Sequence, residues 1–497
     1  MERYRKITTL IVLLAFSLRL FGLDSNSLWV DELFTLKGSQ FSSVSELLSW
    51  LYSSEYSDGV GFYIVEWFSF RVPGLSTEGS LRLAPLIFSI STVPFIGLLA
   101  KRFFDNKTAI YAMLFFSVSM TQIYFAQEAR PYSGIVFFST INTFLWLEMI
   151  LPREESWSKR FLLWGYIVSS TLGCYFDFAV ILFTLAHFAS APFLVGFNLE
   201  KMKIQTSASG AILLLFSPGI YRFIGALRSR PNYMEQPQIY FFRDYQVMHF
   251  NGWEFFFWVA ILLYFYYFCR CIFSIEWEKT VSENARRFTP ELFFAIWLAI
   301  PAIVLVLYSW ATEPVINSKR LLFTSPASYV LLSKASLEFG NNFRRADIIP
   351  VLLVSALLTH TIIVSEYYSE NNKQPIREGI ELLNENYDGE SVYAFPDSHF
   401  FSSYYDSIIE DQSMEYQPIR WHGSSQNTED FVGTIKGEGS GWILVADNNN
   451  DPFEIDKLLL DIGPEASIVE EFYWSHTDPF NEGWENVRLL RISIVDY

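Results

Sequence analysis

The sequence predicts a polytopic α-helical membrane protein that ends in a small soluble domain. Of its 497 residues, 51% are hydrophobic and 18% aromatic, which is more apolar than an ordinary soluble domain. Apolar windows of about twenty residues, long enough to cross a bilayer as helices, recur between short charged breaks. After Glu366 the composition becomes that of a soluble domain.

About eleven transmembrane helices are expected from these windows. They are placed at 7–23, 83–100, 108–125, 134–151, 161–177, 178–197, 204–221, 254–275, 292–311, 321–338 and 348–365. Cytoplasmic loops carry an excess of Lys and Arg. With the N-terminus inside, basic residues gather in every inside loop, at 101–107, 153–160, 201–203, 279–287 and 344–345. We therefore expect a cytoplasmic N-terminus and an extracytoplasmic C-terminal domain in a cell membrane.

The first outer loop, residues 24–82, has the pattern of a folded segment. Ser43-Val44-Ser45-Glu46 is a helix-capping box and opens an apolar stripe. A second apolar segment, from Phe62 to Phe68, is too short to cross the bilayer. We predict interfacial helices at both places.

The chain is expected to divide into a membrane domain, 1–365, and an acidic extracytoplasmic domain, 366–497. The second contains predicted helices at 376–386 and 454–462 and strands at 391–395, 442–446, 467–473 and 487–494. Alternating elements of this kind indicate a small α/β domain. The formal net charge is −17, and no basic face is evident, so nucleic-acid binding is not expected.

Charged groups stand at the outer ends of the predicted spans. Asp31 and Glu32 follow the first span, and carboxylates at a bilayer edge are costly unless they face water, a cation or a substrate. Further candidates for substrate or phosphate binding lie at other outer boundaries: Arg82, Glu128, Arg130, Tyr132, Lys319 and Arg320. Such a set suits an anionic lipid-linked substrate, because Arg and Lys bind phosphate and a carboxylate accepts a hydroxyl proton.

These groups also have structural interpretations. Asp31 is compatible with a hydrated helix end, and Arg130 with an ion pair to Glu128 that caps a helical hairpin. Lys319 and Arg320 are compatible with anchors that extend to the membrane surface.

Three motifs together resemble those of the GT-C glycosyltransferases of family 39, which include protein O-mannosyltransferases and bacterial enzymes that decorate lipid A. They are Ser27-Leu28-Trp29-Val30-Asp31-Glu32, Glu78-Gly79-Ser80-Leu81-Arg82-Leu83 and Gln127-Glu128-Ala129-Arg130-Pro131-Tyr132. The resemblance covers the membrane domain. It implies a GT-C fold and a hexosyl or pentosyl transfer, with inversion, from a polyprenyl-phosphate donor on the outer face to a lipid, glycan or protein acceptor.

The resemblance also implies roles for individual residues. Carried over by position, Asp31 would be the catalytic carboxylate with Glu32 beside it, and Arg130 would be a functional cation of the second outer turn. On this basis we expect Asp31 to act as general base, and Arg130 and Lys319 or Arg320 to hold the departing phosphate. The sequence departs from the family at 58–63, which lacks the His and Pro of relatives, and at Leu321, where relatives often have Tyr. These departures concern the substrate pockets more than the reaction class.

Cofactors and rival functions stay open at this point. No nucleotide-binding motif is evident, and an Asp–Glu pair can hold a divalent cation, so no cofactor is assigned. A transporter or flippase for a lipid-linked or anionic solute would place ionisable groups in mid-span and repeat its halves. A non-catalytic relative would lack a pocket beside Asp31. Membrane lipids are expected partners in each case.

Overall fold

The computed structural model divides the chain into two compact units. The helical unit comprises Met1–Phe21, Val44–Val65 and Arg82–Ser365, and the sheet unit comprises Gly22–Ser43, Glu66–Leu81 and Glu366–Tyr497. The first outer loop is therefore shared between the two. The structure describes residues 2–53, 59–152, 157–195, 198–228, 236–273, 289–312, 314, 316–343, 345–369, 372–387, 389–395, 404, 416–418, 440–447, 458–459, 466–475 and 486–494.

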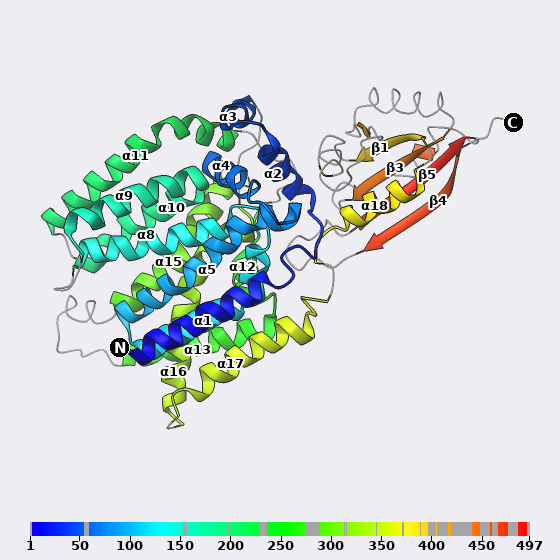
Figure 1. The fold of residues 1–497 in the computed structure, drawn as a ribbon. Coiled ribbons are helices and arrows are strands. Elements are labelled where there is room, and N and C mark those ends of the chain that lie inside the picture. The colour runs from blue at the N-terminus through cyan, green and yellow to red at the C-terminus, as the bar shows by residue number, and fades with distance from the viewer. Residues whose placement is uncertain are drawn as a thin grey trace. The chain divides into compact units, whose positions relative to one another are not determined.

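Helices build the helical unit and fall on every predicted transmembrane span (Figure 1). They are α1 (Glu2–Leu20), α5 (Thr77–Phe103), α6 (Asn106–Val118), α7 (Met120–Ala126), α8 (Tyr132–Ile150), α9 (Lys159–Phe176), α10 (Ala179–Val195), α11 (Leu199–Arg228), α12 (Phe241–His249), α13 (Glu254–Phe273), α15 (Thr289–Ala311), η1 (Ser318–Thr324), α16 (Ser325–Asn341), α17 (Ile348–Thr359) and η2 (His360–Val364). Among the described helices, five are long and apolar enough to cross a membrane, or six if α6 and α7 form one bent span. The chain is a multi-pass membrane protein, and the expected number of spans stays a prediction.

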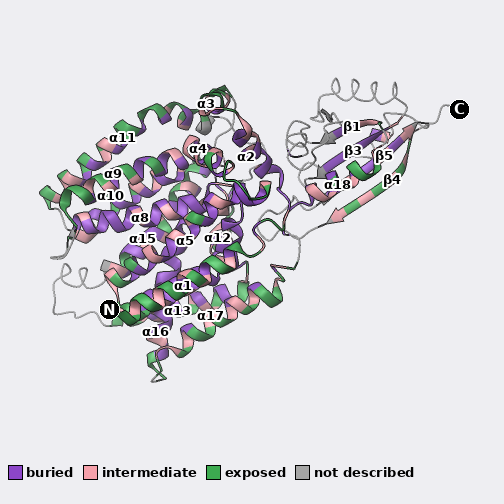
Figure 2. Cartoon of the chain, in the orientation of Figure 1, coloured by how far each residue is buried: buried purple, intermediate pink, exposed green. Residues whose placement is uncertain are grey.

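Burial differs strongly between the helices of this unit. Nearly all of α8 is buried, whereas most residues of α11 and α13 are exposed or only partly buried (Figure 2). A helix that is apolar on its exposed face is suited to contact with lipid. The interior of the helical unit therefore lies around α8, whose first residue is the candidate Tyr132.

A break at Ser119 separates α6 from α7, and the two helix axes differ there by 59°. Such a break leaves carbonyl groups at the end of the first helix without intrahelical partners. The buried guanidinium of Arg19, in α1, donates hydrogen bonds to the carbonyl oxygens of Phe116 (3.0 Å) and Ser117 (2.9 Å). This arginine stabilises the bend, which explains a charged residue inside an apolar region.

Three short helices lie in the first outer loop: α2 (Val30–Gln40), α3 (Val44–Ser53) and α4 (Val60–Ser69). The helices α3 and α4 confirm the two helical segments that the apolar patterns predict. The sequence analysis did not predict α2, although it contains the Asp31-Glu32 pair.

The sheet unit contains α18 (Ile376–Asn386) and a five-stranded sheet of order β2-β1-β3-β5-β4. The strands are β1 (Ser391–Phe395), β2 (Tyr416–Pro418), β3 (Ser440–Asp447), β4 (Ala466–Ser475) and β5 (Asn486–Ile494). β1 pairs in parallel with β2 and β3, whereas β5 is antiparallel to β3 and β4. The helix packs on β3 and β5, and buries Ile380 and Leu383 (Figure 1).

Most predicted elements of this unit are confirmed. The bounds of α18 and β1 agree with the predicted 376–386 and 391–395, and β3, β4 and β5 contain the other predicted strands. The short strand β2 was not predicted. The predicted helix at 454–462 lies outside the described residues, apart from 458–459.

Candidate functional site

Asp31 and Glu32 occupy the first turn of α2. The Glu32 carboxylate is fully buried and accepts a hydrogen bond, of 3.3 Å, from the backbone N–H of Trp29, which precedes the helix. A glutamate at the third helical position that bonds back in this way is half of a capping box. The half-buried Asp31 follows Val30 at the helix start, and successive helical residues point in different directions. Glu32 thus fixes the turn, and Asp31 is the more accessible carboxylate.

A lysine from the segment after the last span neutralises Glu32. The Nζ atom of Lys373 lies 3.1 Å from Oε1 of Glu32, and the two side chains are 3% and 0% exposed. A charge is almost never fully buried unless it is paired. The Glu32 carboxylate therefore has a cation on one oxygen and a backbone donor on the other.

A second carboxyl group, that of Glu66 in α4, is buried beside this pair. Its two oxygens accept no hydrogen bond from the part of the chain that the structure describes. Burial, and then the charge of Glu32, raise the pKa of Glu66 well above its usual value. Burial therefore favours the protonated form of the Glu66 carboxyl up to a higher pH than in an exposed glutamate. Glu66 is not among the predicted site residues, although it is the one acidic residue in the apolar run 62–68 and could have been found from that pattern.

Two side chains from beyond residue 366 bind backbone groups next to the Asp31-Glu32 pair. The N–H of Leu28 donates to the hydroxyl of Tyr404 (3.1 Å), and that of Val30 donates to Oε1 of Gln374 (3.3 Å). The N–H groups at a helix start have no intrahelical acceptor. Those around the start of α2 are satisfied by side chains of the sheet unit.

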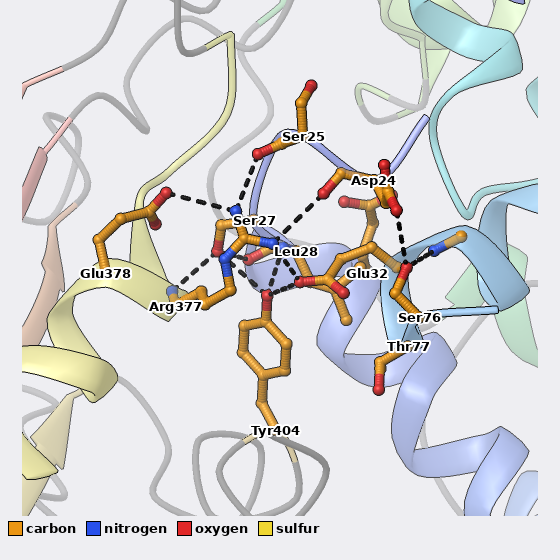
Figure 3. Close-up of polar contacts among 12 residues, drawn as sticks. Asp24, Ser25, Ser27, Leu28, Glu32, Ser76, Thr77, Arg377, Glu378 and Tyr404 are labelled. Carbon is orange, nitrogen blue, oxygen red and sulfur yellow. Dashed lines mark hydrogen bonds and ion pairs between the residues drawn. The ribbon is translucent and has the colours of Figure 1, made fainter. Parts of the chain in front are cut away.

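Arg377 and Tyr404 extend this network to the start of α5 (Figure 3). The Arg377 guanidinium donates to Oε1 of Glu78 (2.9 Å) and to the carbonyl oxygen of Ser25 (2.8 Å). The Tyr404 hydroxyl donates to the same Glu78 oxygen at 2.7 Å. Burial, and then the charge of Glu78, raise the pKa of Tyr404, so that it stays a donor. Glu78 therefore has a structural role here.

The second candidate cluster lies in the turn between α7 and α8, in the helical unit. Glu128 is fully buried and Arg130 is half-buried. The amide of Gln127 holds the turn against the end of α1, because its Nε2 donates to the carbonyl oxygens of Arg19 (2.9 Å) and Phe21 (2.8 Å). The tight turn that the sequence predicts is confirmed. This attachment fixes the position of the turn that contains Glu128 and Arg130.

Tyr132 ends the turn and begins α8. Its side chain is 9% exposed, and its ring packs edge-on against Phe125 at a centroid distance of 5.0 Å. A tyrosine so enclosed is positioned by packing.

Lys319 and Arg320 are half-buried and lie on η1, not in a loop before an α-helix. The helix α16 begins only at Ser325, and Pro326 in its first turn favours a start there. The predicted span 321–338 therefore begins too early. η1 packs against α8 and α12, and Ser325 accepts a hydrogen bond of 3.1 Å from Gln122 of α7. The structure thus places the Lys319-Arg320 pair on an element that packs against α8, the helix that follows the Gln127–Pro131 turn.

Arg82 is only 1% exposed. Arg82 lies near the start of α5, and its burial is consistent with a structural role there. Arg82 and the five other phosphate or substrate candidates belong to the helical unit, whereas Asp31 and Glu32 belong to the sheet unit. Among the described residues, no group of three or more His, Cys, Asp or Glu side chains could hold a metal ion.

Solved structures with this fold identify its type. ArnT from Cupriavidus metallidurans bound to undecaprenyl phosphate superposes with a TM-score of 0.57, at 11% identity, over 97% of each chain. AglB, the oligosaccharyltransferase of Archaeoglobus fulgidus, in complex with an inhibitory peptide and a dolichol-phosphate, superposes with a TM-score of 0.53 at 10% identity. That match covers 89% of this chain and 69% of AglB.

The chain has the GT-C fold. No protein-family model and no curated protein sequence matches it. The GT-C likeness is therefore one of structure, at an identity that shows the fold alone. In this GT-C fold, the first outer loop and the turn between α7 and α8 contain the motifs on which the sequence resemblance rests.

Proposed function

We propose that the chain is a membrane glycosyltransferase that transfers a sugar, with inversion, from a polyprenyl-phosphate donor to an acceptor on the outer face of a cell membrane. The observation that carries this proposal is the fixed, half-buried Asp31 at the start of α2. It is held there by a buried ion pair of its neighbour Glu32. Support comes from the GT-C fold, because two solved proteins with that fold contain undecaprenyl phosphate or dolichol-phosphate.

The proposed reaction needs one proton acceptor and one set of cations. Asp31 accepts the proton of the acceptor hydroxyl or amine as this group forms its bond to the anomeric carbon. The bond between that carbon and the phosphate oxygen breaks, and the polyprenyl phosphate leaves with the bonding electrons. Arg130 and Lys319 or Arg320 stabilise the negative charge that grows on this phosphate.

Glu32 and Glu128 take supporting roles in this proposal. Because Glu32 is bound to Lys373 and to the Trp29 N–H, it is a poor proton acceptor and a good positioning group. Glu128 and Tyr132, which lie close to Arg130 in the sequence, are proposed to assist substrate binding at this turn. The acceptor is a lipid, glycan or protein, and the sugar is a hexose or pentose.

The decisive experiment compares two aspartates of one loop. Purified Asp31→Asn protein should fold and bind the donor normally but lose transfer from polyprenyl-phosphate sugars by at least about a hundredfold. Asp24 lies in the same loop and is exposed, and in Figure 3 its carboxylate accepts one hydrogen bond, from Ser76 at 3.3 Å. Asp24→Asn is therefore the matched control. Near-normal turnover of the Asp31→Asn protein would remove Asp31 from the role of base.

A further inference from the structure

Residues 372–374, which shortly precede α18, are buried, which is unusual in a connecting segment. Asn372, Lys373 and Gln374 are 5%, 2% and 0% exposed. Connecting segments normally run over the surface, where water satisfies their polar groups. Three consecutive buried polar residues need protein partners. The side chain of Asn372 donates to the carbonyl oxygen of Tyr367 (2.6 Å), and the partners of Lys373 and Gln374 lie in the first outer loop.

The partners of this segment flank Asp31 on both sides. Gln374 accepts the N–H of Val30, the residue before Asp31, at 3.3 Å. Lys373 binds the carboxylate of Glu32, the residue after Asp31, at 3.1 Å. The backbone on one side of Asp31 and the side chain on the other are therefore both held by the segment 372–374.

The same connection continues along the chain in both directions. The backbone N–H of Asn372 donates to the side chain of Asn26 (2.9 Å), and that of Arg377 donates to the hydroxyl of Ser27 (2.9 Å). Figure 3 shows Arg377 beside Ser25 and Ser27 of the first outer loop, and its guanidinium donates to the carbonyl oxygen of Ser25 at 2.8 Å. Residues 372–377 thus bind residues 25–32 at several points, with Lys373 as the buried charge among them.

The charge of Lys373 has a specific consequence for Glu32. Without it, the Glu32 carboxylate would stay buried near the carboxyl of Glu66 and would lose the cation that lies 3.1 Å away. Glu32 would then take up a proton or leave the interior. A protonated Glu32 accepts more weakly from the Trp29 N–H, so the first turn of α2 loosens around Asp31.

We propose that Lys373 is a positioning residue for the transfer reaction, which sets the geometry of Asp31 through its ion pair with Glu32. This inference rests on the proposed function. In this proposal the segment 372–377 does more than connect two elements of the chain, because it holds the helix start that contains the catalytic Asp31.

The test uses the full-length protein in lipid nanodiscs and three variants. Lys373→Met removes the charge, Lys373→Arg keeps it, and Lys37→Met changes a half-buried lysine of α2, the helix that contains Glu32. Two kinds of measurement are made. Mass spectrometry follows the hydrogen exchange of residues 28–33, and steady-state kinetics with a polyprenyl-phosphate sugar gives kcat and KM.

The Lys373→Met protein should exchange faster at residues 28–33 and lose about ten- to a hundredfold in kcat, because a small misplacement of a reacting group is costly. Its KM for the donor should change by less than about threefold, since Lys373 acts through Glu32 and not on the phosphate. Lys373→Arg should recover most of kcat and of the protection. Lys37→Met should resemble the wild type.

Several results would overturn the proposal. One is wild-type exchange and kcat in Lys373→Met protein while Asp31→Asn is inactive. Another is a rise in KM alone, which would make Lys373 a direct phosphate ligand. If Lys373→Met does not fold, the double variant Glu32→Gln/Lys373→Met removes both charges, and unchanged exchange at residues 28–33 in it would refute the proposal. If the wild type transfers no sugar, the proposed function fails, and the exchange data alone decide whether Lys373 holds α2.

Discussion

The guanidinium of Arg377 lies 2.9 Å from the carboxylate of Glu78, so the first turn of α18 is joined to the first turn of α5. Their side chains are 23% and 5% exposed. Because Glu78 also accepts from Tyr404, one carboxylate organises two donors that come from beyond residue 366. These contacts bind the start of α18 and Tyr404 to the first outer loop.

Breaking this contact should destabilise the sheet unit. Arg377→Met leaves the Glu78 carboxylate buried without its cation, which should cost about 2 kcal/mol of unfolding free energy. The loss is measured by denaturant unfolding of the purified protein in detergent. Arg243→Gln is the control, because Arg243 and Asp244 form an ion pair with side chains 46% and 37% exposed, and exposed pairs contribute little. Equal stability of both variants would contradict the prediction.

The raised pKa of Glu66 predicts how stability depends on pH. The folded protein holds this proton to a higher pH than the unfolded chain does, so stability falls as pH rises above the pKa of an unfolded glutamate. The fall ends only where the folded Glu66 itself ionises.

A Glu66→Gln variant removes that dependence. Its Tm should exceed that of the wild type by a margin that grows as the pH rises above about 4, in thermal unfolding followed by intrinsic fluorescence. Glu46→Gln changes an exposed glutamate of α3 and should leave the wild-type curve unaltered. Parallel curves for wild type and Glu66→Gln would show that Glu66 is ionised in the folded protein.

The proposed phosphate cations predict a change in lipid affinity. Arg130→Met and Arg320→Met should each weaken the binding of a polyprenyl phosphate about tenfold, because each removes a charge-assisted hydrogen bond to phosphate. Binding is measured by titration of a fluorescent polyprenyl phosphate into protein in detergent. Arg345, an exposed residue of a predicted inside loop, is the control, and Arg345→Met should bind as the wild type does. An unchanged dissociation constant would favour the structural interpretations, in which Arg130 pairs with Glu128 and Arg320 is an anchor.

Much of the fold follows from local patterns in the sequence. Apolar windows located a helix at each predicted span, and the amphipathic pattern at 376–386 gave the bounds of α18. The 3₁₀ helix η1 escaped prediction because its Leu321-Leu322-Phe323 run continues the apolar pattern of the span. The helix α2 escaped because its start is capped by Glu32, Gln374 and Tyr404, two of which are remote in the sequence.

The sequence by itself determined that this is a membrane protein with charged groups at predicted outer boundaries, since hydropathy and charge are properties of single residues. It also singled out Asp31 and Arg130, because the motifs around them are contiguous. Only the tertiary structure decided that Glu32 is paired with Lys373, that Glu66 is buried beside it, and that residues 372–377 hold the start of α2. These contacts join segments far apart in the chain. Each such pair offsets its desolvation only where the fold brings the charges together.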